Sequence, residues 1–279
     1  LGDTASILTT CLVEYALIGA AVMFVLWKSV DSQDNRSLQR LKRKSQMRID
    51  CKSTSAGIFL GIFVLIATFI AIGINAVNSK EKVDSVPLST AIFFLVVYTT
   101  CIGGTLIALI RMRKMQYKES ATGEFVDQIL MIVGMFAEFL YCGCQIDLFA
   151  LCSYVFNYDV THTALMQPFI FIVFIIRYVQ VVTQSAFILL SFRLTVENRR
   201  EERRMAGRQM VTFLLVANVS LFAYHIYEGV AKSIGSDGPA HSATEVIIFS
   251  VTPIIAFFRF HSSVCLAEIW KHAYSTKPH

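Results

Sequence analysis

Seven long apolar runs divide this chain, and each is long enough to cross a lipid bilayer. A membrane-spanning helix needs ~20 mostly apolar residues. The runs cover residues 8–27, 56–77, 88–110, 125–155, 167–192, 209–230 and 244–270. Charged residues make up 16% of the chain, against about 25% in a soluble globular protein. The sequence therefore predicts an all-α, polytopic membrane protein with seven transmembrane helices.

The basic residues lie in alternate connections between these helices. Lys and Arg gather in the first, third and fifth connections and in the C-terminal tail (28–52, 111–118, 193–208 and 271–277). Loops rich in Lys and Arg remain on the cytosolic side of a membrane. The C-terminus is therefore predicted to be cytosolic, and the first helix to run from outside to inside. The net charge of +5 reflects this topology and does not indicate a nucleic-acid partner.

Ionisable and amide side chains interrupt the middle of several apolar runs. A charge at membrane depth is costly, so it normally faces the interior of a helix bundle or a water-filled path. Such residues mark routes for ions or substrates and are the candidates for function here. The central ones are Glu138, Arg177, Gln180, Asn218, Arg259 and His261.

The spacing of these residues places them on shared helix faces. Arg177, Gln180 and Gln184 follow the i, i+3, i+7 pattern of one face. Two further stripes are Asn218, His225 and Glu228 on the next helix, and Phe258, His261, Cys265 and Glu268 on the last. The stripes fit either a narrow polar path or interhelical hydrogen bonds worth on the order of 0.6–2 kcal/mol. The candidate ion pairs are Glu138 with Arg177 and Glu228 with Arg259.

Two other titratable residues have both a structural and a functional interpretation. His261 is either a neutral, hydrogen-bonded imidazole or a proton carrier, because the ordinary histidine pKa of about 6.5 lies near physiological pH. Glu14 lies near the outer end of the first helix. It either collects protons from water or closes the end of the helix bundle.

The sequence holds no catalytic constellation. We find no H-E-x-x-H, no G-x-S-x-G and no phosphate-binding glycine loop, so an enzyme is not expected. The seven cysteines lie mostly within apolar runs and are interpreted as packing residues, not as disulfides. Cys142 and Cys144 lack nearby ligands at zinc-site spacing, so neither a metal nor a cofactor is predicted.

Four stretches resemble helices of the otopetrin family. Thr252–Trp270, which reads TPIIAFFRFHSSVCLAEIW, resembles the last helix of these proteins. Val211–Glu228 resembles their penultimate helix, Gln180–Ile188 their tenth, and Glu14–Ala21 their sixth. The resemblance spans most of the chain and is strongest after residue 167.

The resemblance implies a fold and a function. Otopetrins are dimeric, proton-selective channels with twelve transmembrane helices in two six-helix halves. On that template, residues 1–28 are the last helix of the N-terminal half, 29–55 a basic cytosolic linker and 56–279 the C-terminal half. The implied partners are protons, the lipid bilayer, a second copy of the chain and a sterol at an interface between halves or subunits. The implied location is the plasma membrane.

The resemblance also implies particular site residues. Each half of an otopetrin has a constriction of Gln, Asn or Asp, and Tyr. This chain offers Gln180 or Gln184, then Asn218, then Phe258 where many members have Tyr, so one hydroxyl is missing. Tyr15, beside Glu14, is the match in the N-terminal half. Inhibition by Zn²⁺, a family property, makes His162 and His241 in the predicted outer loops candidate zinc-contacting groups.

These observations predict a proton channel, with acid activation, in which buried groups and water relay protons. The predicted path comprises Glu14, Tyr15, Glu138, Gln180, Gln184, Asn218, Glu228, Phe258, Arg259 and His261. Two other classes remain open. A proton-coupled transporter would need a co-substrate. A seven-helix G-protein-coupled receptor would share the outside-to-inside first helix, but the third helix lacks Asp-Arg-Tyr and the last helix lacks Asn-Pro-x-x-Tyr.

Overall fold

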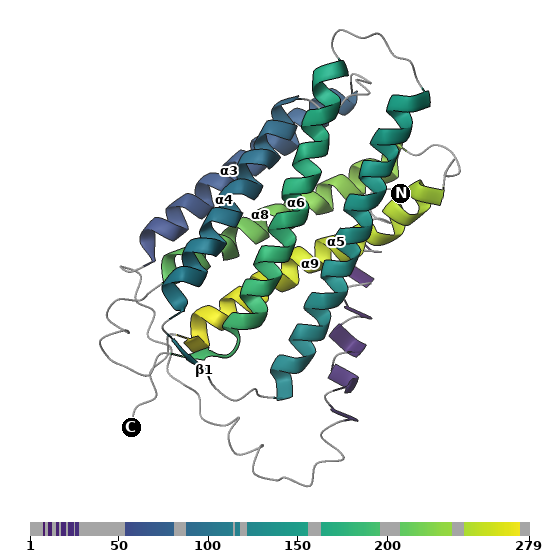
Figure 1. The fold of residues 1–279 in the computed structure, drawn as a ribbon. Coiled ribbons are helices and arrows are strands. Elements are labelled where there is room, and N and C mark those ends of the chain that lie inside the picture. Colours follow the sequence, from purple (N-terminus) through teal and green to yellow (C-terminus); the bar gives the residue numbers. More distant parts are fainter. Residues whose placement is uncertain are drawn as a thin grey trace, which may run out of the picture.

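The structure, a computed structural model, is a bundle of long helices (Figure 1). It describes residues 54–80, 88–113, 115–117, 122–155, 163–195, 207–235 and 243–273, together with 8, 11–12, 15–16, 18–20, 22–24 and 26–27. The long helices of this part are α3 (Ser55–Lys80), α4 (Leu88–Met112), α5 (Thr122–Val155), α6 (Thr163–Ser191), α8 (Arg208–Gly235) and α9 (Ala243–Ala273).

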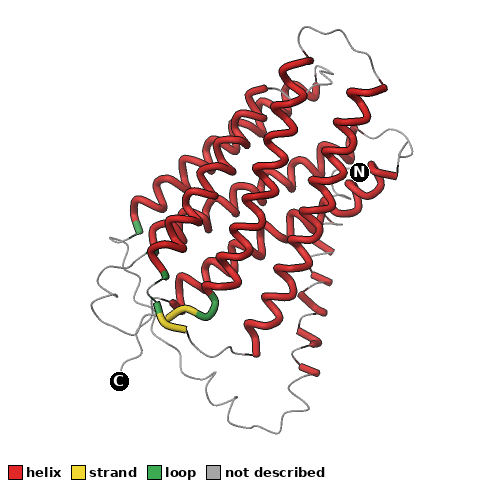
Figure 2. The backbone as a smooth tube through the Cα atoms, in the orientation of Figure 1, coloured by secondary structure: helices red, strands yellow, loops and turns green. Residues whose placement is uncertain are grey.

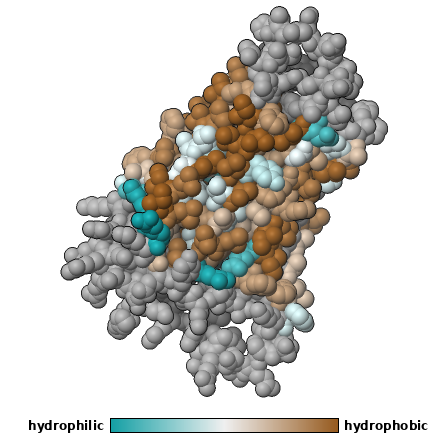
Figure 3. Space-filling view, viewed as in Figure 1, coloured by the Kyte–Doolittle hydropathy of each residue, from teal (hydrophilic) through white to brown (hydrophobic). Residues whose placement is uncertain are grey.

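The predicted membrane spans are confirmed for these six helices. Each contains a segment of 22 to 26 residues that is long and apolar enough to cross a bilayer. The described residues between 8 and 27 are also helical and pack on α5, where the Phe24 and Phe125 rings lie 6.3 Å apart. The predicted boundaries agree with the observed ones to within a few residues, because the length of an apolar run is a strong signal. Figure 3 shows apolar side chains over much of the middle of the bundle.

The six long helices pack in a closed order. α3 packs on α8, α8 on α9, α9 on α5, α5 on α6, α6 on α4, and α4 again on α3. Further contacts of α4 with α8 and of α6 with α9 cross the interior. The centre is therefore filled by side chains from opposite sides of the ring. Its largest fully buried members include Arg259, Tyr98, Phe187, Phe213 and Phe258.

One end of the bundle carries basic residues next to the helix termini, and we call it the basic end. α4, α6 and α9 end there, and α8 begins there, close to Arg111, Arg193, Arg208 and Lys271. A short antiparallel pair, β1 (Gln116–Tyr117) with β2 (Leu194–Thr195), joins two connections at this end (Figure 2). The sequence does not predict this pair, because a two-residue ladder has no measurable hydrophobic period.

Two glycines on one face of α3 allow it to approach α8 closely. A side chain at Gly57 would meet the backbone carbonyl of Gln209, and one at Gly61 would lie 2.6 Å from Val216 Cβ. Small residues four apart are a common contact face between membrane helices, because they bring two backbones together. The α3–α8 contact therefore depends on the absence of side chains at these two positions.

We expect Gly61→Ala to lower the stability of the protein by about 1–3 kcal/mol, the usual cost of overpacking. Gly73, on the same helix, is the matched control because nothing lies within 4 Å of its Cβ position. Gly73→Ala should be neutral or stabilising, since alanine favours a helix by up to about 1 kcal/mol over glycine. Thermal unfolding of the detergent-solubilised variants checks both. Equal Tm values for the two variants would contradict the close packing of α3 on α8.

Candidate functional site

A carboxylate at the centre of the bundle binds two arginines. Glu138 of α5 accepts hydrogen bonds at Oε2 from Arg177 Nη2 (2.7 Å) and Arg177 Nε (3.0 Å). Its other oxygen, Oε1, lies 2.8 Å from Nη2 of Arg259. This second contact is an ion pair without hydrogen-bond alignment. All three side chains are at least 95% buried, so the cluster ties α5, α6 and α9 together inside the apolar bundle.

One of the two predicted ion pairs is confirmed and the other is wrong. Glu138 binds Arg177 as expected, but Arg259 also binds Glu138 instead of Glu228. The reason is depth along the membrane. Glu228 lies about 15 Å along α8 from Asn218, at 1.5 Å per residue. Asn218 is at the level of the amides that reach Arg259, so Glu228 lies much nearer the end opposite the basic end.

A branch of amides runs from Arg259 toward the basic end. Arg259 Nη1 donates to Gln180 Oε1 at 2.9 Å, and Gln180 Nε2 donates to Gln184 Oε1 at 2.8 Å. Gln184 and Asn218 then exchange two hydrogen bonds of 2.9 and 3.0 Å. Asn218 Nδ2 also donates to the Leu214 carbonyl oxygen. The prediction that Gln180 and Gln184 share an inward face with Arg177 is confirmed, since all three are buried.

A titratable branch runs from Arg177 in the other direction. Nη2 of Arg177 lies 3.5 Å from His225 Nε2, and His225 Nδ1 lies 3.1 Å from Glu228 Oε2. The Tyr141 hydroxyl donates to Glu228 Oε1 at 2.6 Å. A neutral imidazole with its hydrogen on Nδ1 satisfies both neighbours, because it donates to the carboxylate and accepts from the guanidinium. The Glu228 side chain is 21% exposed and is the least buried member of the network.

Two members of this network, His225 and Tyr141, were absent from the predicted path. The stripe of Asn218, His225 and Glu228 contained the signal for His225. Tyr141 is three residues beyond Glu138 on α5, so it lies on the same face one turn further along. Its ring also packs against the Arg177 guanidinium, with 4.6 Å between Cζ and the ring centroid.

Phe258 takes part only as an apolar wall. It is fully buried, packs against Gly134 and lies 5.3 Å from the Arg259 guanidinium. The hydroxyl that the family pattern would place at this position is therefore missing, and Gln184 bonds Asn218 without it. Tyr98 of α4 was not predicted. Its ring lies 5.8 Å from Arg259 Cζ, and its buried hydroxyl has no hydrogen-bond partner among the described residues.

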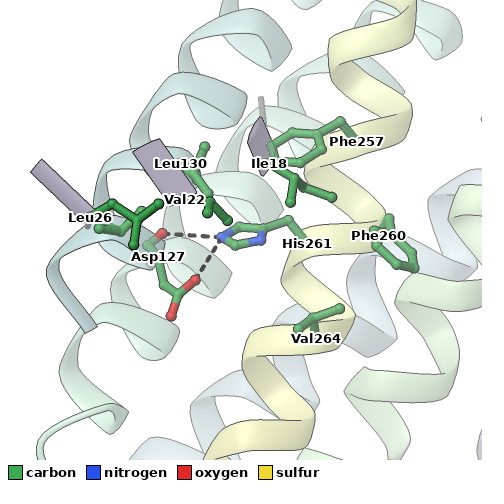
Figure 4. Close-up of a pocket in the computed structure, with 10 residues that line it drawn as sticks. Ile18, Val22, Leu26, Asp127, Leu130, Phe257, Phe260, His261 and Val264 are labelled. Atoms are coloured by element: carbon green, nitrogen blue, oxygen red, sulfur yellow. Dashed lines mark hydrogen bonds and ion pairs between the residues drawn. The ribbon is translucent and has the colours of Figure 1, made fainter. Parts of the chain in front are cut away.

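His261 belongs to a second cluster on another face of α9. Its Nε2 lies 3.2 Å from the Asp127 backbone carbonyl and 4.0 Å from Asp127 Oδ1 (Figure 4). Cys265 Sγ lies 3.5 Å from the same nitrogen, and the Phe257 ring stacks on the imidazole. The predicted residues therefore lie in two places, around Glu138 in the bundle interior and around His261 beside Asp127.

The second cluster opens onto an apolar groove of about 400 Å³ between the first helix, α5 and α9. In Figure 4, His261 points toward Asp127 across this groove, and Ile18 and Val22 of the first helix face them. Tyr15, on the same helix, is 79% exposed. Glu14, His162 and His241 lie outside the described residues. No group of three His, Cys, Asp or Glu side chains in the described part is arranged to hold a metal ion.

The Glu138 network forms one continuous chain of contacts. In order it runs Tyr141, Glu228, His225, Arg177, Glu138, Arg259, Gln180, Gln184 and Asn218. From Glu228 to Asn218 it covers about 15 Å, roughly half of a 30 Å hydrocarbon core. Ser185 and Ser191 of α6 are also buried, but their hydroxyls have no hydrogen-bond partner among the described residues and do not extend the chain. The network can exchange hydrogen-bond partners, and most of its members are fully buried among packed side chains.

Known proteins match almost the whole chain. The sequence model of the otopetrin family matches residues 1–260. Proton channel OtopLc of Drosophila melanogaster is 30% identical over 292 residues, which cover 99% of this chain and 18% of the fly protein. The chain thus spans less than a fifth of the length of that relative. With its six apolar spans, it is a multi-pass membrane protein, and it belongs to the otopetrin family.

Proposed function

We propose that this chain conducts protons across a membrane as part of an otopetrin channel. The observation that carries the proposal is the line of polar groups from Tyr141 and Glu228 to Asn218, in which Glu228, His225 and Glu138 can carry a proton and the two arginines are fixed charges beside them. In a membrane bundle, ionisable groups that face the interior are typical of proton relays. The name of the fly relative, a proton channel, supports the same function.

The groups that make up the Glu138 network favour protons over other cations. A proton crosses by exchange along hydrogen bonds and needs no opening wide enough for a hydrated ion. A metal cation at the level of Glu138 would come close to two guanidinium groups. At 4 Å and an effective dielectric constant of 20, each would repel it by about 4 kcal/mol, and the Glu138 carboxylate would offset one of the two. A proton on this cluster meets the same net charge, so the preference for protons rests on the hydrogen-bond exchange that Na⁺ and K⁺ cannot use.

The remaining features of the proposal come from family resemblance. The chain supplies helices six to twelve of a twelve-helix, two-half channel that works as a dimer in the plasma membrane, with its C-terminus in the cytosol. Acid on the outer side opens it, and a sterol fills an interface between halves or subunits. The basic end then faces the cytosol, which agrees with the charge of its loops, and Glu228 lies toward the outside.

The alternatives differ in what they require. Membership of the otopetrin family argues against a G-protein-coupled receptor. A proton-coupled transporter would bind a second substrate and saturate with it. His261 and the groove beside it give a second possible route within the channel function, between the first helix and α9.

We expect an acid step to evoke a current in cells that express the longest form of the protein carrying this sequence. Its reversal potential should move by about 59 mV per pH unit, the value for a singly charged permeant ion. Whole-cell recording at fixed Na⁺, K⁺ and Cl⁻ measures this. Replacing Na⁺ by a large organic cation should leave the reversal potential unchanged. A current that required an added substrate would favour the transporter.

We expect Glu228→Gln to lower the proton current at least about tenfold, a barrier increase of about 1.4 kcal/mol. The amide keeps the shape of the side chain but cannot take up and release a proton. Because Glu228 is partly exposed, the protein should still fold. The current is normalised to protein at the cell surface, measured by biotin labelling.

The matched control is Ser250→Ala on the exposed face of α9, where the hydroxyl bonds only the Val246 carbonyl of its own helix. This variant should conduct like the parent protein. His261→Gln tests the second route, because His261 lies outside the Glu138 network. A loss of current in His261→Gln with an unchanged current in Glu228→Gln would move the proton path from the bundle interior to the groove.

A further inference from the structure

Arg177 stands at the junction between two parts of the polar chain. One of its nitrogens, Nη2, lies 2.7 Å from Glu138 Oε2 and 3.5 Å from His225 Nε2. The central carboxylate and the titratable branch therefore have a guanidinium nitrogen between them. A guanidinium remains protonated at every physiological pH and has no acceptor atom. A proton on the titratable branch cannot pass through Arg177 to reach Glu138.

The same contact fixes the state of His225. Its Nδ1 faces an acceptor, Glu228 Oε2, and its Nε2 faces a donor, Arg177 Nη2. A proton added at Nε2 would set one N–H group against another and place a second positive charge 3.5 Å from the guanidinium. Arg177 thus blocks the atom through which His225 would exchange a proton with Glu138.

Other groups around His225 do not relieve this block. The titratable and charged groups that face it are Glu228 and Tyr224 from α8, Glu138 and Tyr141 from α5, and Arg177 from α6. α3 reaches the region through Asn75, which donates to the Tyr224 hydroxyl. Arg259 of α9 binds the other carboxylate oxygen of Glu138, and Tyr98 of α4 lies beside Arg259. Arg177 is therefore the group that contacts both His225 and Glu138.

The Tyr141 ring offers the guanidinium a second position beside the first. Arg177 Cζ is already 4.6 Å from the centre of the Tyr141 ring, and the Tyr141 hydroxyl binds Glu228. A shift away from Glu138 would keep the guanidinium over an aromatic face, where cations are stabilised, and bring it closer to a second carboxylate. Glu138 would keep its ion pair with Arg259. The shift thus leaves no buried charge without a partner.

We propose that Arg177 is a swinging gate in the proton path. Seated on Glu138, it separates Glu138 from His225. Displaced over Tyr141, it lets a protonated His225 transfer the proton on Nε2 to Glu138 Oε2, which leaves a neutral imidazole and a carboxylic acid. Arg177 is a positioning residue and never carries the transferred proton. The gate rests on the proton-conducting function proposed above.

Arg177→Gln and Arg177→Lys form the central pair of variants. Glutamine removes the fixed positive charge, so we expect roughly tenfold more proton current than in the parent protein at the same pH gradient. Lysine keeps a positive charge between Glu138 and His225, so its current should not exceed that of the parent. A purely structural ion pair predicts the reverse order, because glutamine would disrupt the cluster more than lysine.

A double variant tests whether the gain depends on the step that the gate controls. Adding His225→Leu to Arg177→Gln should cancel the increase, since the opened transfer starts at His225. Surface protein is quantified for each variant. An Arg177→Gln current at or below that of Arg177→Lys, at equal surface levels, would overturn the gate. An increase in current that persists in the double variant without His225 would also overturn the gate.

Tyr141 provides a test that leaves every ion pair of the cluster in place. Tyr141→Phe keeps the ring that receives the displaced guanidinium, and Tyr141→Leu removes it. We expect the leucine variant to conduct several-fold less than the phenylalanine variant. Equal currents would overturn the gate even if Arg177→Gln did not fold. A parent protein without any proton current would instead refute the proposed function, and the gate with it.

Discussion

A carboxylate inside an apolar bundle needs positive neighbours, and Glu138 has two. Removing a charge from water costs several kcal/mol per ion, so buried ions persist only where partners and hydrogen bonds compensate them. Arg177 and Arg259 come from helices on either side of α5, and together they compensate the buried Glu138 carboxylate. The register of α5, α6 and α9 therefore depends on this one cluster. The charge left over, one positive unit, faces Glu228 through His225.

The other contacts of the polar network are determined by the number of N–H donors on the two arginines. Each guanidinium has five N–H groups and no acceptor, and a single carboxylate cannot accept them all. Arg259 gives Nη1 to the Gln180 carbonyl oxygen, which orients that amide toward Gln184 and then Asn218. Arg177 gives Nη2 to His225 Nε2, which places the imidazole hydrogen on the Glu228 side. One ionic cluster thus sets both the direction of the amides and the tautomer of the histidine.

The sequence predicted the helices and their inward faces better than it predicted which side chains bind one another. Apolar runs give the helices, and i, i+3, i+7 spacing gives the inward face of α6 with Arg177, Gln180 and Gln184. The partner of a buried side chain depends on which helices are neighbours and on their relative depth in the bundle. The residue pattern within one helix contains neither piece of information. Arg259 was therefore assigned to Glu228, although it binds Glu138. α9 is buried on most sides, so its periodicity could not separate Arg259 from His261, which faces Asp127 and the groove.

The stability of this core and its proposed transport function do not conflict. A packed interior would have to separate its helices to pass a hydrated ion, and that would break the contacts around Glu138. A proton needs only an exchange of hydrogen-bond partners. The network contains donors and acceptors that can exchange in this way, with Tyr141 and Glu228 beside Arg177 and two glutamines beside Arg259. Each exchange keeps every charge paired, so conduction can proceed by side-chain rearrangement while the six helices keep their packing.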